Sequence, residues 1–392
     1  MNLDDLDLFA AVLAQVEQLY VDDKGRDDLI KAALNGMLES LDPATVYLPP
    51  QEYENFLGEI RGHYAGIGVR IEGHTKGLEV IEIFDASPAL DAGLEVGDII
   101  TSVNGVATVG FDPGEISITI RGPVGTTVSV TVLRGEATEE LEILRALVHP
   151  PALESRWLDK GVAWIQVFEF QEGAAEELNR TLKTYQRQGL QGLVLDLRGN
   201  PGGSLEEAIS MADLFVADGI LVSTKGRDGR EAVERANRRG TFRGLPTVVI
   251  VDEMSASASE ILAGALRDNH AGTVVGATSF GKGTVQQIFS LPNGGGLKLT
   301  VARYFLPSGS TIDQVGISPD FPIAVCALDT LPASTQPDAG MDFVASGTIL
   351  LADIEKPLLE DLCLNGARGI LELGFPNELD PTGKRTKLEE TP

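Results

Sequence analysis

The sequence predicts a multi-domain α+β and α/β protein with four parts: an N-terminal helical segment, a small β-rich domain, an α/β core and a helical C-terminal extension. Three observations lead to this prediction. Apolar residues recur at helical spacing near the N-terminus, short β-rich runs with glycine-rich turns follow, and apolar strands then alternate with helical stretches. The length agrees, because 392 residues at about 150 per domain give two or three domains.

The charge of the chain excludes several classes of partner. The sequence has 31 Lys+Arg and 58 Asp+Glu, a formal net charge of −27. Such a chain repels phosphate backbones and anionic lipid headgroups, so we expect no nucleic-acid partner. No apolar run approaches the roughly 20 residues that cross a bilayer, so we expect no integral membrane segment.

The N-terminus and the cysteines bear on the compartment and on metals. Met1 to Asp5 carry acids where a secretory signal has Lys or Arg, so the chain is either cytoplasmic or begins after a removed signal. Cys326 and Cys363 have no His or Cys beside them, which excludes zinc spacing. We expect two buried thiols, with one disulfide as the alternative, and neither a metal nor a cofactor.

Residues 1–58 are predicted to form an amphipathic helical segment that packs on another surface. Apolar residues recur at helical spacing between Leu6 and Val16 and again between Ile30 and Leu41. Asp42-Pro43 and Leu48-Pro49-Pro50 then break the pattern. Such an appendage is commonly a dimer contact, so a homo-oligomer is among the expected partners.

Residues 59–148 are predicted to form the β-rich domain, and residues 149–324 the α/β core. Pro150-Pro151 lies at the boundary between them. In the core, apolar strands at 162–167, 193–197, 247–251 and 273–275 alternate with helical stretches near 172–188, 204–215 and 257–269. Residues 325–392 form the C-terminal extension, with one or two helices over 342–372 and a polar tail from 377.

Ser257 is the first candidate for chemistry, in the stretch Ser255-Ala256-Ser257-Ala258-Ser259-Glu260 between a predicted strand and a helix. Ser257 and Glu260 have the spacing of a capping box, which would be a purely structural role. The same turn exposes a serine, and the first amides of the helix can stabilise an oxyanion. Both interpretations remain open at this point.

A serine nucleophile needs a base, and the four histidines do not provide one. His270 lies at the far end of the helix that Ser257 would begin, about 20 Å away at 1.5 Å per residue, and the other three lie in or beside the β-rich domain. Lys282 is the alternative, because burial can lower a lysine pKa far enough for it to accept a proton. Gly276 to Lys282 also fits a phosphate loop, but Gly283 replaces its Ser or Thr and a strand follows, so we reject that interpretation.

Two glycine-rich turns can bind ligands through backbone amides. Asp196 to Gly203 follows a predicted buried strand, and glycines there permit positive φ and free amides. Tyr64 to Val69 opens the β-rich domain, where such a turn can hold a peptide carboxylate while the peptide adds a strand. An ordinary turn is the alternative in each case.

Together these residues resemble the carboxyl-terminal processing protease family, in which a PDZ domain precedes a Ser–Lys protease core of ClpP/crotonase-like type. The resemblance runs from about residue 5 to 322. Its motifs lie at residues 36–48, 66–68, 87–98, 121–126, 196–203, 255–264, 279–286 and 316–320.

The resemblance implies a role for each matching residue. Ser257 would be the nucleophile, Lys282 the general base, and Gln286 the residue that holds the lysine. The amides of Ala258 and Gly202 would form the oxyanion hole. Arg121 lies where PDZ domain and core could communicate and is a regulatory candidate. The PDZ groove would bind the substrate C-terminus through the following residues: Gly66, Ile67, Gly68 and Val69.

The expected function is therefore a serine endopeptidase that cleaves protein substrates near a free C-terminus, in the periplasm or cell envelope as the family implies, with an unidentified activator among its partners. A catalytically silent PDZ scaffold that tethers protein C-termini is the alternative. Two departures stand out. Ala44 replaces a histidine frequent after Asp42-Pro43, and Ile116, Ile118 and Ile120 alternate like a strand where the PDZ helix of residues 112–120 is expected.

Overall fold

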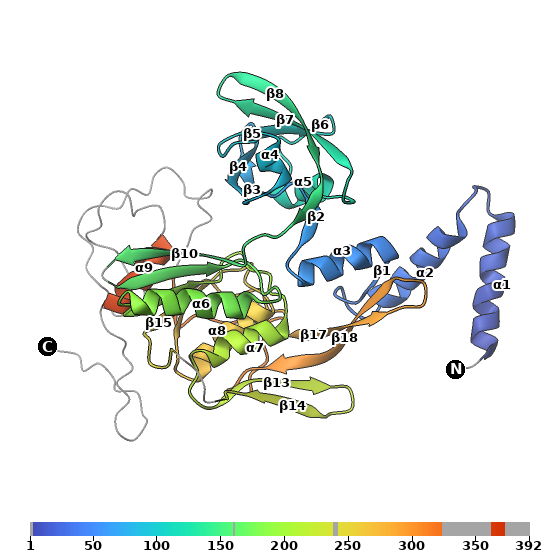
Figure 1. Cartoon of the computed structure of the whole chain (residues 1–392). Helices are drawn as coiled ribbons and strands as arrows, with labels where there is room; N and C mark the ends of the chain where they lie inside the picture. The colour runs from blue at the N-terminus through green and yellow to red at the C-terminus, as the bar shows by residue number, and fades with distance from the viewer. Residues whose placement is uncertain (1–2, 160, 238–241, 324–361, 373–392) are drawn as a thin grey trace, which may run out of the picture.

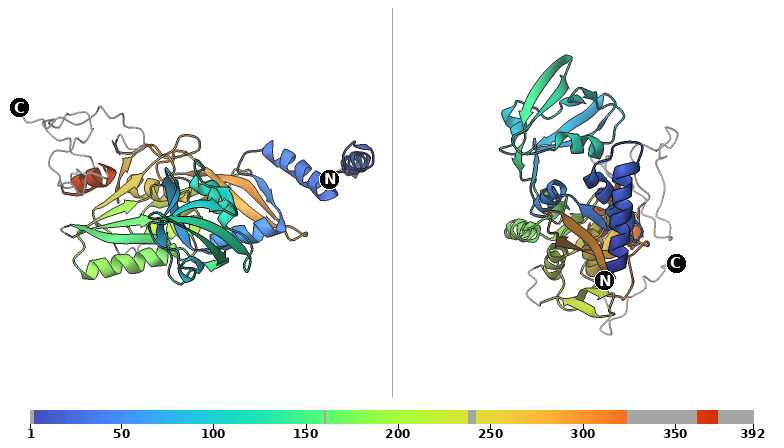
Figure 2. Two further views of the ribbon diagram at one scale, coloured as in Figure 1. Left: turned by 90° about the horizontal axis from the view of Figure 1, so that it is seen from above. Right: turned by 90° about the vertical axis from the view of Figure 1, so that its right-hand side faces the viewer.

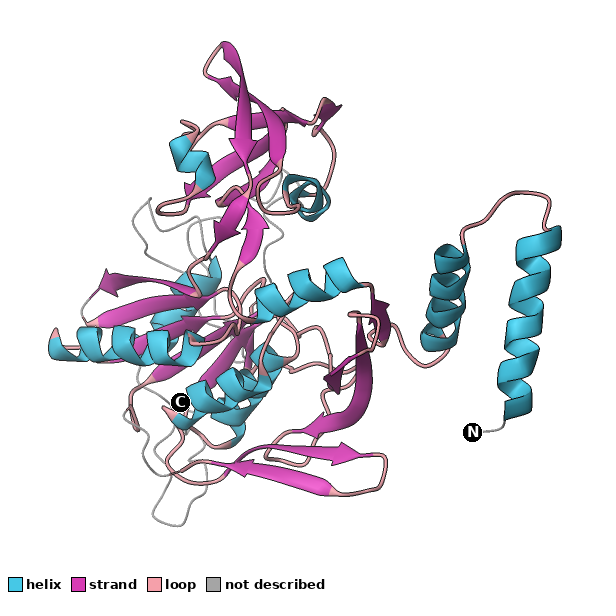
Figure 3. Cartoon of the chain, turned by 45° about the vertical axis from the view of Figure 1, so that its right-hand side comes forward, coloured by secondary structure: helices cyan, strands magenta, loops and turns pink. Residues whose placement is uncertain are grey.

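The computed structural model describes residues 3–159, 161–237, 242–323 and 362–372. The N-terminal part contains α1 (Leu3–Leu19), α2 (Arg26–Glu39), β1 (Val46–Leu48) and α3 (Pro50–Ile60). The expected helices are present, but the stretch between the two proline breaks is a strand, which the helical prediction for 1–58 omitted. α1 has no buried residue, and α1 and α2 extend away from the rest of the molecule (Figure 1 and Figure 3).

The β-rich domain is a sheet with the strand order β3-β4-β5-β7-β8, and β6 pairs with β5. β3 is an edge strand, and α5 packs beside it. The elements are β3 (Val69–His74), β4 (Gly77–Ile83), α4 (Pro88–Asp91), β5 (Ile99–Val103), β6 (Val106–Ala107), α5 (Pro113–Ile120), β7 (Thr127–Arg134) and β8 (Ala137–Leu144).

The segment whose isoleucines alternate like a strand is the helix α5. The Asp112 side chain caps it by accepting a hydrogen bond from the Gly114 amide at 2.7 Å. Ile116 and Ile120, four residues apart, are buried in the domain core, whereas Ile118 is 76% exposed. The segment is therefore a helix, because a spacing of four residues puts Ile116 and Ile120 on the one helix face that packs into the core.

A two-stranded ribbon connects the β-rich domain to the core. β2 (Tyr64–Gly66) pairs antiparallel with β9 (Ala146–Val148). The segment that enters the β-rich domain therefore lies beside the segment that leaves it. Figure 1 shows the domain held above the core on this ribbon. Beside it, His63 and His149 lie with ring centroids 5.7 Å apart.

The core is built on a six-stranded sheet with the order β10-β11-β12-β15-β16-β19, parallel except for β10. Every residue of β12 and β15 is buried, as expected for central parallel strands. The strands are β10 (Leu153–Asp159), β11 (Val162–Val167), β12 (Gly192–Asp196), β15 (Thr247–Val251), β16 (Thr273–Gly276) and β19 (Phe321–Pro322).

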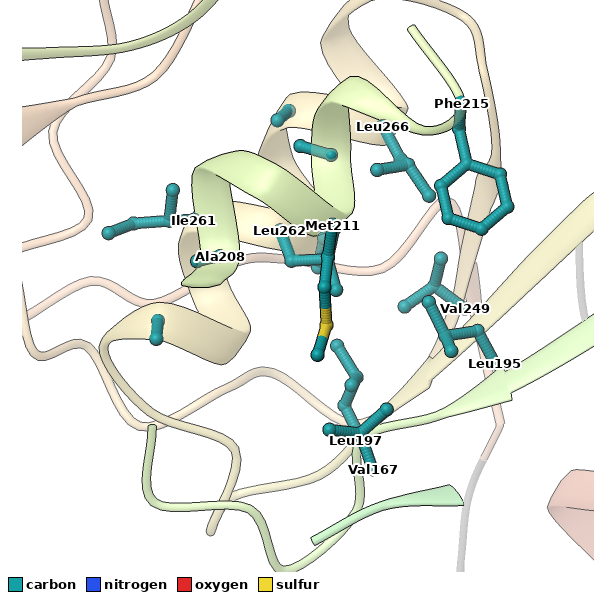
Figure 4. Packing of buried hydrophobic residues seen from close by; sticks show 14 of the residues in the cluster. Val167, Leu195, Leu197, Ala208, Met211, Phe215, Val249, Ile261, Leu262 and Leu266 are labelled. Atoms are coloured by element: carbon teal, nitrogen blue, oxygen red, sulfur yellow. The ribbon is translucent and has the colours of Figure 1, made fainter. Parts of the chain in front are cut away.

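Helices cover both faces of this sheet. α6 (Ala174–Arg187), α7 (Leu205–Asp213) and α8 (Ala258–Asp268) belong to the larger core on one face. Figure 4 shows Met211 of α7 and Leu262 of α8 packed above Leu195 and Val249 of the sheet. α9 (Leu362–Glu372) covers the other face, against Trp164, Val194, Val248, Ile250 and Val275.

A second sheet lies beside the first and connects the N-terminal part to the core. Its order is β1-β18-β13-β14, and β17 pairs with the other edge of β18. β17 and β18 are joined by the glycine-rich turn of residues 291–295 (Figure 2). The strands are β13 (Ile220–Gly226), β14 (Glu231–Arg235), β17 (Thr284–Ser290) and β18 (Gly296–Phe305).

No helix in the described ranges is both long and apolar enough to cross a membrane. The expectations for Cys326, for the polar tail from 377 and for most of the C-terminal extension lie outside the described residues, as does the side chain of Cys363. Of the expected helices over 342–372, the structure describes α9.

Candidate active site

Ser257 lies on a strained turn between the buried strand β15 and the helix α8. Its backbone has φ 56° and ψ −111°, a conformation that a residue with a side chain rarely adopts. The residue is 7% exposed. The fold thus holds this hydroxyl at the start of a helix at a cost in backbone energy, which is typical of a functional position.

The glycine turn of residues 199–203 packs directly on Ser257. A Cβ on Gly202 would lie 2.8 Å from the Ala256 carbonyl oxygen and 3.0 Å from the Ala258 amide nitrogen, so only glycine fits there. The Gly202 amide donates to Asn200 Oδ1 at 2.9 Å. The Ala258 amide and the neighbouring Gly203 amide have no acceptor among the described residues. The two amides predicted from the sequence are therefore adjacent, and one of them is engaged.

Lys282 lies in the loop between β16 and β17 and is half-buried. Burial lowers the pKa of its ammonium, and the negative charge of Glu260 opposes this effect only in part. A lysine with a lowered pKa is neutral at a lower pH than usual and can then accept a proton.

Glu260 connects the turn of Ser257 to the loop of Lys282. Its fully buried carboxylate accepts from the Ser257 amide at 2.8 Å and from the Lys282 amide at 2.9 Å. It also accepts from Ser279 Oγ at 2.6 Å and from the Gly281 amide at 2.7 Å. The capping interaction expected from the sequence is thus real, but the sequence did not reveal that the same carboxylate holds a second loop 20 residues away.

Tyr304 of β18 is a site residue that the sequence analysis missed. Burial raises the pKa of its phenol to about 12, and the nearby Ser257 side chain opposes this effect only in part. Its backbone amide donates to the Gly283 carbonyl at 2.8 Å. An aromatic residue in a strand carries no sequence signal for this contact, which exists because β18 runs beside the Lys282 loop.

Gln286 of β17 lies in the same part of the core, but its amide is directed to threonines. Gln286 Nε2 donates to Thr284 Oγ1 at 2.8 Å and to Thr300 Oγ1 at 3.4 Å. Two sheet neighbours therefore hold the side chain expected to contact Lys282.

The residues expected to bind a peptide C-terminus line one groove of the β-rich domain. Ile67, Gly68 and Val69 line it together with Ser117 and Ile120 of α5. The amides of Ile67 and Gly68 have no acceptor within the described residues. The fourth predicted residue, Gly66, does not line the groove, and a Cβ there would lie 2.6 Å from the Tyr64 ring.

Arg121 lies at the end of this groove and joins the domain to the N-terminal part. Its guanidinium pairs with the Glu59 carboxylate of α3 and lies 4.5 Å from the centroid of the Tyr64 ring. The charge of Arg121 also reaches Glu169, whose carboxyl pKa is raised by burial and by Glu59. Arg121 thus contacts the N-terminal part directly, whereas only its charge acts on Glu169 of the core.

A buried serine at a helix start, a half-buried lysine and an attached peptide-groove domain define the class of PDZ-containing serine peptidases. Family models agree: residues 65–144 match the PDZ domain and residues 161–323 match peptidase family S41. The chain belongs to the carboxyl-terminal processing protease family and is a serine-type peptidase of that processing type.

Relatives and a solved structure give the extent of the similarity. The carboxy-terminal-processing protease of Bartonella bacilliformis is 35% identical over 80% of this chain and 73% of its own length. The carboxy-terminal processing protease CtpA of Bacillus subtilis is 34% identical over 96% and 81%. The structure of a photosystem II D1 C-terminal processing protease is 28% identical and covers 80% of this chain and 92% of its own, with a TM-score of 0.51.

Proposed function

We propose that this endopeptidase works through a dyad of Ser257 and Lys282 and cleaves protein substrates near their C-termini. The observation that carries the proposal is the Glu260 carboxylate, which accepts hydrogen bonds from the backbone amides of both residues. Nucleophile and base are thereby held by one rigid, buried group. A static scaffold that only binds protein ends would have no need for this arrangement or for a strained serine.

The chemistry follows from these positions. Neutral Lys282 takes the proton of Ser257 Oγ, which attacks the substrate carbonyl carbon. The lysine then returns the proton to the leaving amine as the peptide C–N bond breaks. A water molecule, deprotonated by the same lysine, cleaves the resulting ester and frees Ser257. Gln286 would hold Lys282 in the required orientation.

The developing oxyanion would bind the amides of Ala258 and Gly202 at the start of α8. The Gly202 N–H must first leave Asn200 Oδ1, an exchange of one acceptor for another. The adjacent Gly203 amide offers a second donor on the same turn.

The PDZ groove would receive the C-terminal carboxylate of the substrate at the free amides of Ile67 and Gly68, between Gly66 and Val69. The rest of the peptide would add along the open edge of β3. Arg121, through Glu59, would report the position of the PDZ domain to the core.

Several coarser expectations complete the proposal. We keep the division into residues 1–58, 59–148, 149–324 and 325–392, and a ClpP/crotonase-like core, which the parallel sheet with a nucleophile at a helix start supports. We place the enzyme in the cell envelope, as its family implies. The exposed apolar side chains of α1 support self-association, and an activator remains part of the proposal.

Cleavage of an unstructured protein with an apolar C-terminus tests the dyad. We expect cleavage by the wild type, none by Ser257→Ala or Lys282→Ala, and unchanged cleavage by the control Lys225→Ala, which removes an exposed lysine. Retained activity in Lys282→Ala would contradict the assignment of the base. Inactivity of the wild type, together with tight peptide binding, would favour the tethering scaffold.

A further inference from the structure

We propose that Asp42 is a positioning residue, which acts through Thr300 to orient the Gln286 amide with its oxygen free for Lys282. This inference rests on the proposed dyad and adds to it a contribution from the N-terminal part of the chain. It follows from the hydrogen bonds that join the three side chains.

Asp42 lies in the turn that leads into β1 and receives three hydrogen bonds. Its Oδ1 accepts from the Ala44 amide at 2.8 Å and from Thr300 Oγ1 at 3.2 Å, and its Oδ2 accepts from Thr45 Oγ1 at 3.0 Å. Burial alone would raise the pKa of this carboxyl, but the hydrogen bonds from Thr45, Ala44 and Thr300 hold the pKa below its usual value. Asp42 is therefore ionised at neutral pH and can only accept.

The charge on Asp42 fixes the direction of the hydroxyl protons. A threonine hydroxyl has one proton, and Thr300 gives its proton to Asp42. Thr45 also gives its proton to Asp42 and accepts from the Thr300 amide at 3.2 Å. Thr300 Oγ1 thus has only lone pairs left for any further neighbour.

Gln286 is that further neighbour. The Thr300 and Gln286 Cα positions are partners in the β17–β18 ladder, and Gln286 Nε2 lies 3.4 Å from Thr300 Oγ1 and 2.8 Å from Thr284 Oγ1. If the amide were turned over, its oxygen would face the lone pairs of Thr300. Both N–H protons are therefore directed to the two threonines, and the amide oxygen is left over for the Lys282 ammonium or amine.

The fold explains why the N-terminal part carries this group. β1 pairs with β18 through Val46 and Lys298, so the turn at Asp42 is held two residues along β18, beside Thr300. Among the described residues, the carboxylate that accepts the Thr300 hydroxyl proton therefore comes from the N-terminal part and not from the core.

The first experiment measures kcat and KM for Asp42→Asn, with Asp23→Asn in an exposed loop as a matched control for lost charge. We expect kcat to fall about tenfold or more, the scale seen when a partner that orients a functional group is removed, and KM to stay within twofold. A Gln286 amide that turns its NH₂ to Lys282 also stabilises the neutral amine. The acid limb of the kcat profile should therefore move to lower pH, which a loss of packing would not cause.

A double-mutant cycle with Gln286 supplies the decisive test. If Asp42 acts through Gln286, Asp42→Asn should reduce kcat little further in a Gln286→Ala background. Thr300→Val should reproduce the defect, and Thr300→Ser, which keeps the hydroxyl, should restore most of the activity. The Thr300 variants keep the test valid if Asp42→Asn fails to fold.

Two results would overturn the inference: equal losses from Asp42→Asn with and without Gln286, or wild-type activity in Thr300→Val. Failure of the dyad itself is distinguishable, because Lys282→Ala would then remain active.

Discussion

Lys282 donates its backbone amide to the buried carboxylate of Glu260 at 2.9 Å, so the loop of the proposed base is attached to α8, the helix that begins after Ser257, the proposed nucleophile. The side chain of Lys282 has no such attachment to Ser257. The geometry of the proposed dyad thus depends on main-chain hydrogen bonds to Glu260, which fix the backbone from which both side chains extend.

Glu260→Gln should therefore abolish most of the activity, because Glu260 accepts from the backbone amides of both Ser257 and Lys282. A glutamine offers one acceptor oxygen and an NH₂ group with two donor N–H bonds where four donors converge, so at least one buried N–H or O–H loses its partner. We expect a loss of stability of about 1–3 kcal/mol and at least a tenfold fall in kcat. Urea unfolding and peptide cleavage measure the two effects, and Glu253→Gln, on the exposed side of the same turn, is the control. A fully active Glu260→Gln enzyme would contradict this account.

The pH dependence should follow Lys282. Burial lowers the pKa of this amine, so activity should rise with pH through a value below the ordinary 10.5. Below its unfolded pKa, the unfolded chain binds more protons at this site than the folded one, so this site's contribution to stability increases as pH rises. Lys282→Met should consequently be inactive yet more stable than the wild type at neutral pH, with the difference shrinking toward pH 10.5. Thermal melts across pH test this, and a less stable Lys282→Met would refute it.

Gly202→Ala should inactivate the enzyme. The added methyl group would lie 2.9 Å from Ser257 Cβ, and φ 108° is unfavourable for alanine. We expect about a hundredfold loss of kcat, the scale of a lost oxyanion donor. Gly36→Ala, in the open middle of α2, is the matched control and should keep full activity. Equal activity of the two variants would show that the turn can move aside.

Tyr304→Phe should weaken catalysis without changing its pH dependence. The variant keeps the buried ring and removes the hydroxyl that acts on Ser257, and we expect a loss the size of one hydrogen bond, about 1 kcal/mol or about fivefold in kcat. With a pKa of about 12, the phenol stays protonated throughout the working range and is not the base. A shifted pH profile in Tyr304→Phe would contradict that conclusion.

Periodicity predicted the central strands and helices of the core because these elements are long and buried on a fixed face. The predicted strands 162–167 and 247–251 form β11 (Val162–Val167) and β15 (Thr247–Val251). β1 was missed because three residues between prolines have no detectable period. α5 looked like a strand because the exposed Ile118, between the buried Ile116 and Ile120, completes an alternating apolar pattern.

Site residues in turns marked by a sequence motif could be predicted, whereas site residues contributed by a neighbouring strand could not. Ser257, Lys282 and the glycine turn lie in recognisable loops. Tyr304 and Thr300 come from a strand whose place beside the site depends on sheet pairing. Likewise, sequence spacing revealed the cap of Glu260 but not its hold on Lys282, because the contact joins segments that meet only in the folded core.

The packing of α9 on the sheet affects how easily one copy of the enzyme could cleave another. Leu364, Ala367 and Ile370 are buried against the sheet, so a neighbouring molecule could thread the chain into its active site past Glu372 only by pulling this helix away. That step would uncover Val194, Val248 and Ile250 to water, and the apolar surface lost from burial would resist it. Cleavage within α9 by another copy of the enzyme should therefore be slow as long as the helix stays packed on the sheet.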